Sequence, residues 1–185
     1  VDAAPCGRCG PCSGADLGLS LEQTDAAERW LAHRPVVIRG YRALLKPGWS
    51  LYDSSRKSTY FMDFMRSRTR DSPDSSTLEG LAELSALHAE GHTLVPLPSS
   101  TWAGRDAAIE ALNLPVWRGL RWAQEPEARQ GVLLNNDQRR ANVQGRMTAD
   151  GVPPDGAVVL FDDYTGSGAT LQEAARALRE AGHTG

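Results

Sequence analysis

Long apolar runs are missing from this chain of 185 residues. No stretch approaches the roughly 18 consecutive apolar residues that a membrane-spanning helix needs, and no charged start followed by an apolar block predicts a signal peptide. Cysteine is scarce, and an odd count of three argues against a framework of disulfides. With 41% hydrophobic residues the chain can still bury a core, so we expect a soluble, cytoplasmic protein of one or two domains.

The sequence also lacks a phosphate loop that closes with Gly-Lys-Ser/Thr, and it contains no ATPase motor motif. What it does contain, at residues 158 to 178, is a short apolar run that ends on Asp162 and Asp163. A stretch of Thr, Gly and Ser follows and opens an Ala-rich segment with apolar residues at helical spacing. This pattern predicts a strand, a loop and a helix. Acids at the carboxyl end of a strand and a glycine loop at a helix N-terminus suit a ligand with hydroxyls and a phosphate.

These residues resemble the phosphoribosyl-diphosphate motif of type I phosphoribosyltransferases. The resemblance implies an α/β fold with a parallel sheet and flanking helices, acids that hold ribose, a loop that holds phosphate, and magnesium bound with the phosphoribosyl ligand. The implied site residues are Asp162, Asp163, Thr165, Gly166, Ser167, Gly168, Ala169 and Thr170. Gly166 stands where many members of the family have Thr or an acid, so we expect binding without efficient transfer. The alternative is a strand-loop-helix turn that binds nothing.

Two further segments extend this resemblance. Residues 93 to 100 form an apolar run that enters a Pro/Ser loop, which corresponds to the first core strand and the diphosphate loop of the family, so Ser99 and Ser100 are candidate contacts. The polar segment 121 to 148 contains a pattern similar to the mobile active-site loop of ComF-like phosphoribosyltransferases, in which Arg139 and Arg140 would close over a diphosphate. The alternatives are a simple strand-to-helix turn and two exposed arginines in a loose loop.

All three cysteines lie within residues 5 to 12, as Cys6, Cys9 and Cys12. Two Cys-x-x-Cys steps separated by Gly and Pro predict a tetrahedral zinc site. A fourth Cys before Val1, or more weakly His33, would complete it. The start at Val1 and a last helix without a following strand lead us to expect a piece of a longer chain. A redox dithiol or free thiols are the alternatives.

The cysteine cluster resembles the last three zinc ligands of the RecQ family of DNA helicases. Together with the phosphoribosyl motif, it resembles a RecQ-like subgroup that joins this zinc module to a phosphoribosyltransferase-like domain. The resemblance implies a C-terminal accessory region of an ATP-dependent helicase of DNA repair, with the motor upstream. A free-standing ComF-like transferase, and a zinc-ribbon nucleic-acid adaptor without a small-molecule ligand, are the alternatives.

The net charge of −3 conceals an asymmetry. Residues 29 to 70 carry ten Lys and Arg against Asp53 and Asp63, a net charge of +8, whereas the remainder sums to −11. Aromatic residues are interleaved with these charges, and a basic stripe with aromatic faces suits a nucleic-acid backbone. The candidate DNA contacts are Arg56, Lys57, Arg66, Arg68 and Arg70. A solvated basic surface over a small aromatic core is the alternative.

Periodicity and turn residues predict the remaining elements. Helices are expected over residues 21 to 32, with Ser20 as N-cap, over 78 to 88 and over 105 to 112. Strands are expected over 36 to 38, in the apolar run that begins at 93, and over 114 to 117. A Ser/Pro/Asp-rich stretch at 70 to 76 predicts a linker. We therefore expect a zinc-binding and basic module in residues 1–76 and a phosphoribosyltransferase-like domain in residues 77–185, truncated at its C-terminal end.

Overall fold

The computed structural model describes residues 18, 20–33, 35–40, 44–53, 59–68, 72–98 and 102–185. The chain divides into two compact units, Val1–Arg34 and Pro35–Gly185. In the first unit, helix α2 spans Leu21–His33. Ser20 Oγ accepts from the backbone N–H of Gln23 over 3.1 Å, and Gln23 Oε1 accepts from the N–H of Ser20 over 2.9 Å. This reciprocal capping satisfies two N–H groups at the helix start and confirms the predicted helix.

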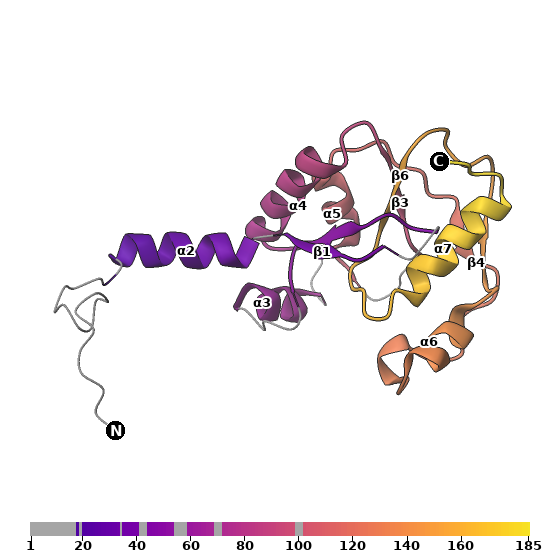
Figure 1. Ribbon diagram of the computed structural model, residues 1–185, viewed down its shortest axis with the longest axis horizontal. Helices are drawn as coiled ribbons and strands as arrows, with labels where there is room; N and C mark the ends of the chain where they lie inside the picture. The colour runs from indigo at the N-terminus through magenta and orange to yellow at the C-terminus, as the bar shows by residue number, and fades with distance from the viewer. Residues whose placement is uncertain are drawn as a thin grey trace, which may run out of the picture. The chain divides into compact units, whose positions relative to one another are not determined.

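The second unit is a mixed α/β fold with short sheets (Figure 1). Its order begins with a hairpin and two helices and continues with strands and helices that alternate except where two helices, and then two strands, follow one another. The elements are β1 Val36–Ile38, β2 Gly48–Ser50, α3 Thr59–Ser67, α4 Ser75–His88, β3 Thr93–Pro96, α5 Arg105–Ala111, β4 Leu120–Trp122, the 3-10 helix η1 Gln130–Val132, α6 Asn136–Val143, β5 Met147–Ala149, β6 Val158–Phe161 and α7 Ala169–Glu180.

Among the described residues, the strands form three pairs. β3 and β6 are parallel, in register from Thr93 with Val158 to Pro96 with Phe161. The pairs β1–β2 and β4–β5 are antiparallel. The strand expected over 114 to 117 is reduced to a single parallel bridge between Val116 and Leu94. Pro115, which has no N–H to extend a ladder, precedes this bridge.

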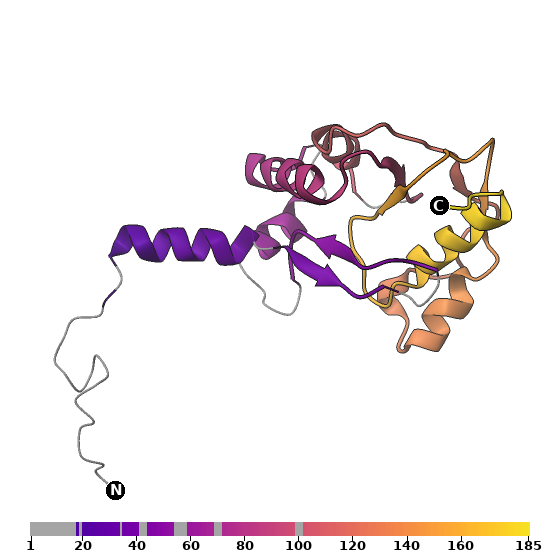
Figure 2. The same cartoon turned by 45° about the horizontal axis from the view of Figure 1, so that its top comes forward.

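Helices cover both faces of the β3–β6 pair. Figures 1 and 2 show α4 and α5 on one side of the two strands and α7 on the other. Successive side chains of a strand point to opposite faces, and β3 follows this rule. Leu94 packs in one cluster with Leu81 and Ile109, whereas Val95 packs in the other with Leu178. The layering of helix, parallel strands and helix places the carboxyl ends of β3 and β6 together at one edge.

The segment predicted as a linker contains the start of α4. Asp74 Oδ1 accepts from the backbone N–H of Thr77 over 2.8 Å, so α4 begins at Ser75, three residues before the predicted start. An Asp at the N-cap satisfies an N–H that has no partner within the helix. The linker prediction was therefore wrong for these residues, because the Asp and Ser that favour a turn also favour a helix cap.

Residues on both sides of the predicted domain boundary share one core. Leu51 and Phe64 precede the boundary between residues 76 and 77, and they pack in the same buried cluster as Leu81 and Trp102. The Phe64 and Trp102 rings meet edge to face, with centroids 5.4 Å apart, a favourable arrangement for two aromatic rings. The described part of the basic segment after residue 35 thus forms one folded body with the α/β layers.

Candidate ligand-binding site at the end of β6

Two acids follow directly after β6. Phe161 is the last residue of the strand, and Asp162 and Asp163 come next, which confirms the predicted position of the pair at a strand end. Asp162 is half-buried, and the side chain of Asp163 is only 6% exposed. The backbone N–H of Asp163 donates to Asp162 Oδ1 over 3.0 Å. Two adjacent carboxylates with little exposure therefore occupy the carboxyl end of a parallel strand, where ligands of α/β proteins bind.

Asp162 has an unusual protonation equilibrium. Burial raises the pKa of its carboxyl, and the negative charge of Asp163 and a hydrogen bond with the Asp163 side chain raise it further. The backbone N–H of Asp163 and the positive charge of Arg105 oppose these effects, with a resulting pKa of about 7. A carboxyl with this pKa is half-protonated near neutral pH. Binding a cation or a hydrogen-bond donor would favour its ionised form. Such a perturbed acid beside a cavity is a typical feature of functional sites.

Asp163 is already paired with a cation. Arg68, in the turn after α3, donates from Nη2 to Asp163 Oδ2, and its side chain is 19% exposed. The sequence predicts that Arg68 contacts DNA, and that role stays a prediction. In the structure, Arg68 links the basic segment to the acid pair across 95 residues of sequence. A ligand that binds Asp163 must therefore share this carboxylate with Arg68.

The loop after the acids leads into α7 through Gly168. Gly168 has a φ of +70°, in the left-handed region that favours glycine. Its carbonyl accepts from the backbone N–H of Gln172 over 3.0 Å, the first hydrogen bond of the helix. The N–H groups of a first helical turn have no acceptor within the helix and lie at the positive end of its dipole. The predicted loop, Thr165 to Thr170, therefore ends in the first turn of α7, and its binding of phosphate stays a prediction.

A cavity of about 660 Å³ reaches the acid pair. Asp162, Asp163 and Thr165 are among the residues that line it, together with side chains of β3, β6, α3, α4, α7 and the β1–β2 hairpin. Residues 166 to 170 of the loop lie outside this lining. Small-molecule pockets in proteins span roughly 300 to 1,000 Å³, so this cavity has room for a ligand of nucleotide size.

Arg139 and Arg140 lie on a helix and not in a loop. They belong to α6, whose N-cap Asn135 accepts from the N–H of Gln138 over 2.9 Å, while Gln138 Oε1 accepts from the N–H of Leu134 over 2.9 Å. The sequence contains a signal for the start of this helix, since Asn-x-x-Gln is a capping pattern. Neither arginine lines the cavity that reaches Asp162. Their role on a diphosphate stays a prediction.

Several predicted site residues lie outside the described part of the chain. They are the zinc ligands Cys6, Cys9 and Cys12, the diphosphate contacts Ser99 and Ser100, and the DNA contacts Arg56, Lys57 and Arg70. Within the described ranges, no three His, Cys, Asp or Glu side chains are grouped to hold a metal ion. The predicted zinc ligands are not among the residues to which this statement applies.

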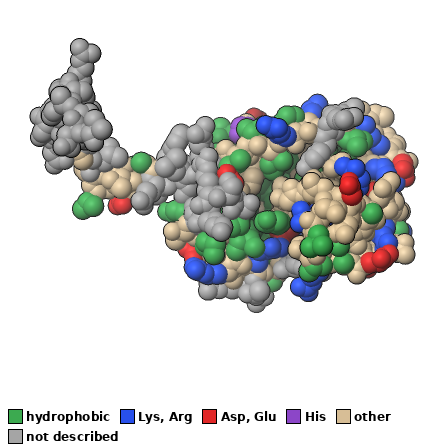
Figure 3. Space-filling view, turned by 60° about the horizontal axis from the view of Figure 1, so that its bottom comes forward, with side chains coloured by type: hydrophobic (Ala, Val, Ile, Leu, Met, Phe, Trp, Pro, Cys, Tyr) green, Lys and Arg blue, Asp and Glu red, His purple; other side chains and the backbone are tan. Residues whose placement is uncertain are grey.

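Among the predicted DNA contacts, Arg66 lies on the surface. Its Nη1 donates to Asp63 Oδ1 over 2.9 Å, and 68% of its side chain is exposed. Figure 3 shows Lys and Arg side chains at several separate places on one face of the molecule. None of the helices in the described residues is both long enough and apolar enough to cross a bilayer.

Sequence reasoning missed Arg105, which lies near the acid pair. The positive charge of Arg105 lowers the pKa of Asp162, and Arg105 Nη2 donates to the carbonyl of Leu97 at the end of β3. An arginine at the first position of a short helix has no distinctive motif, so no signal in the sequence singled it out.

Comparisons with known proteins assign no family to this chain. No family model, no curated protein and no solved structure matches the chain.

Proposed function

We propose that the end of β6 binds a ribose phosphate compound together with magnesium. The observation that carries this proposal is the placement of Asp162 and Asp163 at the carboxyl end of a parallel strand, on the wall of a cavity and before a loop that opens a helix. Hydroxyls and a phosphate on one ligand match this combination of acceptors and donors.

Each part of the site has a chemical task in this proposal. Asp162 accepts hydrogen bonds from ribose hydroxyls, and the backbone N–H groups of Gly166, Ser167 and Gly168 bind the phosphate. Carboxylate oxygens are hard ligands that suit magnesium, so Asp162 and Asp163 would hold the ion, which would supply positive charge to the ligand. Asp163 keeps its contact with Arg68, which positions the carboxylate.

The proposal includes binding and not efficient catalysis of phosphoribosyl transfer. Gly166 has no side chain that could move a proton beside the reacting sugar. Asp162 has a pKa near neutrality, but it is committed to the ribose hydroxyls in this proposal. We therefore expect a site that recognises the ligand and turns it over slowly or not at all.

The wider proposal is that this chain is a C-terminal accessory region of a RecQ-like ATP-dependent DNA helicase. The sequence supports it through the cluster Cys6, Cys9 and Cys12, whose thiolates would hold zinc, and through the net charge of +8 in residues 29 to 70. The exposed Arg66 side chain is a described member of that segment that is accessible to a DNA phosphate.

Calorimetry with phosphoribosyl diphosphate, and with ribose 5-phosphate, tests the ligand site. Both titrations are done with magnesium at a pH above 7, where Asp162 is ionised. We expect Asp162→Asn to weaken binding by about tenfold or more, because a hydrogen bond to a charged acceptor contributes roughly 1.5–3 kcal/mol. Asp155→Asn, an exposed acid in the loop before β6, is the matched control and should bind as the wild type does.

Three results would change this conclusion. An absence of heat with either ligand at millimolar concentration would show that the loop keeps the shape of a cradle without its function. Equal affinities of the Asp162→Asn and Asp155→Asn variants would show that the Asp162 carboxylate does not contact the ligand. Turnover of phosphoribosyl diphosphate with a base would instead favour the free-standing transferase.

A further inference from the structure

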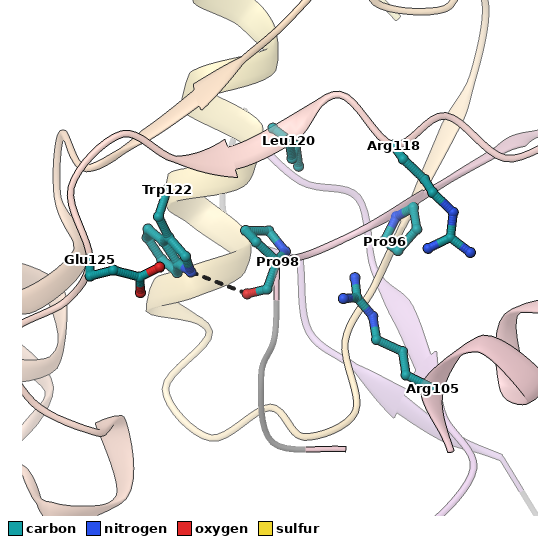
Figure 4. Close-up of a pocket in the computed structure, with 7 residues that line it drawn as sticks. All are labelled: Pro96, Pro98, Arg105, Arg118, Leu120, Trp122 and Glu125. Carbon is teal, nitrogen blue, oxygen red and sulfur yellow. Dashed lines mark hydrogen bonds between the residues drawn. The ribbon is translucent and has the colours of Figure 1, made fainter. Parts of the chain in front are cut away.

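A second pocket, of about 330 Å³, lies beside the end of β3. Figure 4 shows that two arginines border one end of it, a proline and an indole ring lie along its middle, and a glutamate lies beyond the indole. These residues are Arg105, Arg118, Pro98, Trp122 and Glu125. They come from the start of α5, from β4 and from the segments next to them, so the pocket uses none of the acids or loop residues of the proposed ribose phosphate site.

The arginine end of this pocket favours an anion. Arg105 and Arg118 both lie at this end of the pocket, near Pro96 (Figure 4). Burial lowers the pKa of Arg105, and the positive charge of Arg118 lowers it further. An anion between the two groups would relieve their mutual repulsion, and a planar guanidinium suits a carboxylate.

Arg118 can accept such a ligand without losing a strong interaction. Arg105 is half-buried and donates to the Leu97 carbonyl, which fixes its position beside the pocket. Arg118 pairs with Asp106 over 3.0 Å, with 54% and 77% of the two side chains exposed. An ion pair with this exposure contributes little, so a ligand carboxylate can replace Asp106.

The middle of the pocket favours a flat ring. The indole Nε1–H of Trp122 donates to the carbonyl of Pro98 over 3.2 Å, which holds the indole at the pocket wall (Figure 4). Pro96 and Leu120 are buried and add apolar surface. An aromatic wall of this kind packs against another ring with a gain beyond the area buried. The volume is at the lower end of the range for ligand pockets, which limits the ring system to a small one.

Glu125 determines which way round a ligand lies in the pocket. Its carboxylate is exposed and lies on the side of Trp122 away from the two arginines (Figure 4). A carboxylate accepts hydrogen bonds and repels anions. The end of the ligand opposite its anionic group is therefore expected to carry an N–H donor and not a second negative charge.

We propose that this pocket binds a small aromatic carboxylate that carries an amino group, with the carboxylate on Arg105 and Arg118, the ring on Trp122 and the amino group on Glu125. This proposal does not require a ligand on Asp162, Asp163 or the glycine loop, since none of these residues lines the second pocket.

Calorimetry of the whole chain with 4-aminobenzoate tests the proposal. We expect binding that Arg118→Gln weakens by about tenfold, the loss of one charge-assisted interaction. Arg121→Gln is the matched control, since Arg121 is three residues away, is exposed and pairs with Asp150 in the same way. It should leave the affinity unchanged. Glu125→Gln should reduce the preference for 4-aminobenzoate over benzoate.

The remaining titrations separate the ring from the charge. 4-Aminobenzamide lacks the negative charge, and acetate and inorganic phosphate lack the ring, so all three should bind at least about tenfold more weakly than 4-aminobenzoate. If phosphate or acetate bound as tightly, the pocket would be a simple anion site and the proposal would be wrong. Equal affinities of the Arg118→Gln and Arg121→Gln variants, or no binding of 4-aminobenzoate at millimolar concentration, would also overturn it.

Discussion

Glu173 and Asp162 are two acids of the same strand-loop-helix segment, and their surroundings are opposite. Glu173, on α7, is 3% exposed at its side chain and accepts from the backbone N–H of Met147 over 2.9 Å and from Arg176 Nε and Nη2 over 2.9 and 2.6 Å. Burial alone raises its pKa, but the hydrogen bonds from Arg176 and Met147 outweigh burial, so the pKa lies below its ordinary value.

Asp162 has far less compensation. It accepts from the N–H of its neighbour Asp163 over 3.0 Å, and burial and the charge of Asp163 raise its pKa to about 7. The contrast shows that a buried acid keeps its ionised form where hydrogen-bond donors outweigh the cost of burial, as at Glu173, and loses it where burial and a like charge prevail, as at Asp162. An acid whose acceptors are satisfied within the protein stabilises the fold. An acid whose ionised form is not satisfied gains from a ligand, which is why the comparison supports a site at Asp162.

The largest expected effect is the loss of the compensated acid. Glu173→Ala should lower the free energy of unfolding by about 3 kcal/mol, because it leaves Arg176 Nε and the Met147 N–H without their acceptor. Urea denaturation measures this change. Glu180→Ala is the matched control, because Glu180 also pairs with Arg176 but is 67% exposed, and it should cost about 0.5 kcal/mol or less. Equal losses in the two variants would show that the hydrogen bonds of Glu173 do not stabilise the fold.

The two acids should also respond to pH with opposite signs. Between the ordinary pKa of 3.8 and about 7, the folded protein holds the Asp162 proton more tightly than the unfolded chain does. The contribution of Asp162 to stability is therefore complete below the lower value and is lost as the pH rises through the upper one. The lowered pKa of Glu173 has the reverse effect, a loss of stability as the pH falls below its ordinary value of 4.5.

Urea denaturation from about pH 5 to about pH 8 isolates the Asp162 effect, because Glu173 stays ionised throughout that window. Asp162→Asn should flatten the decline of stability toward higher pH, whereas Glu173→Gln should lower stability without altering its slope against pH. An unchanged slope in Asp162→Asn would mean that the carboxyl ionises at its ordinary pH in the folded protein.

The local pattern around these acids could be predicted from the sequence, but their partners could not. Four apolar residues before two acids, and an Ala-rich run after a glycine loop, correctly predicted β6, its loop and α7. The N–H that compensates Glu173 belongs to Met147, 26 residues earlier, and the cation on Asp163 is Arg68, 95 residues earlier. No period or motif connects positions so distant, and tertiary packing alone brings them together.

Helix caps explain two other differences between sequence and structure. Asp74 and Asn135 were interpreted as residues of a linker and of a loop, yet each accepts an N–H hydrogen bond at a helix start. Asn and Asp favour turns and helix caps for the same reason, since their short side chains bond to a nearby backbone N–H. Composition alone therefore could not separate the two outcomes, and only the Asn-x-x-Gln spacing before α6 carried information.

The smallest expected effect on stability extends the contrast from acids to arginines. Arg68 donates to a buried acid, whereas Arg66, two residues earlier, is 68% exposed and pairs with an Asp63 side chain that is 54% exposed. Arg66→Ala should therefore change the free energy of unfolding by about 0.5 kcal/mol or less.

If the basic segment binds DNA, the same variant should lower the slope of log affinity against log salt by about 1, since one phosphate contact is lost. Fluorescence titrations of a single-stranded oligonucleotide at several salt concentrations measure that slope, with Arg121→Ala as an exposed, ion-paired control outside the basic segment. A slope that falls equally in both variants would reflect net charge alone, and an unchanged slope in Arg66→Ala would exclude this arginine as a DNA contact. A fall confined to Arg66→Ala would instead assign the two arginines different tasks, Arg68 in positioning Asp163 and Arg66 in binding phosphate.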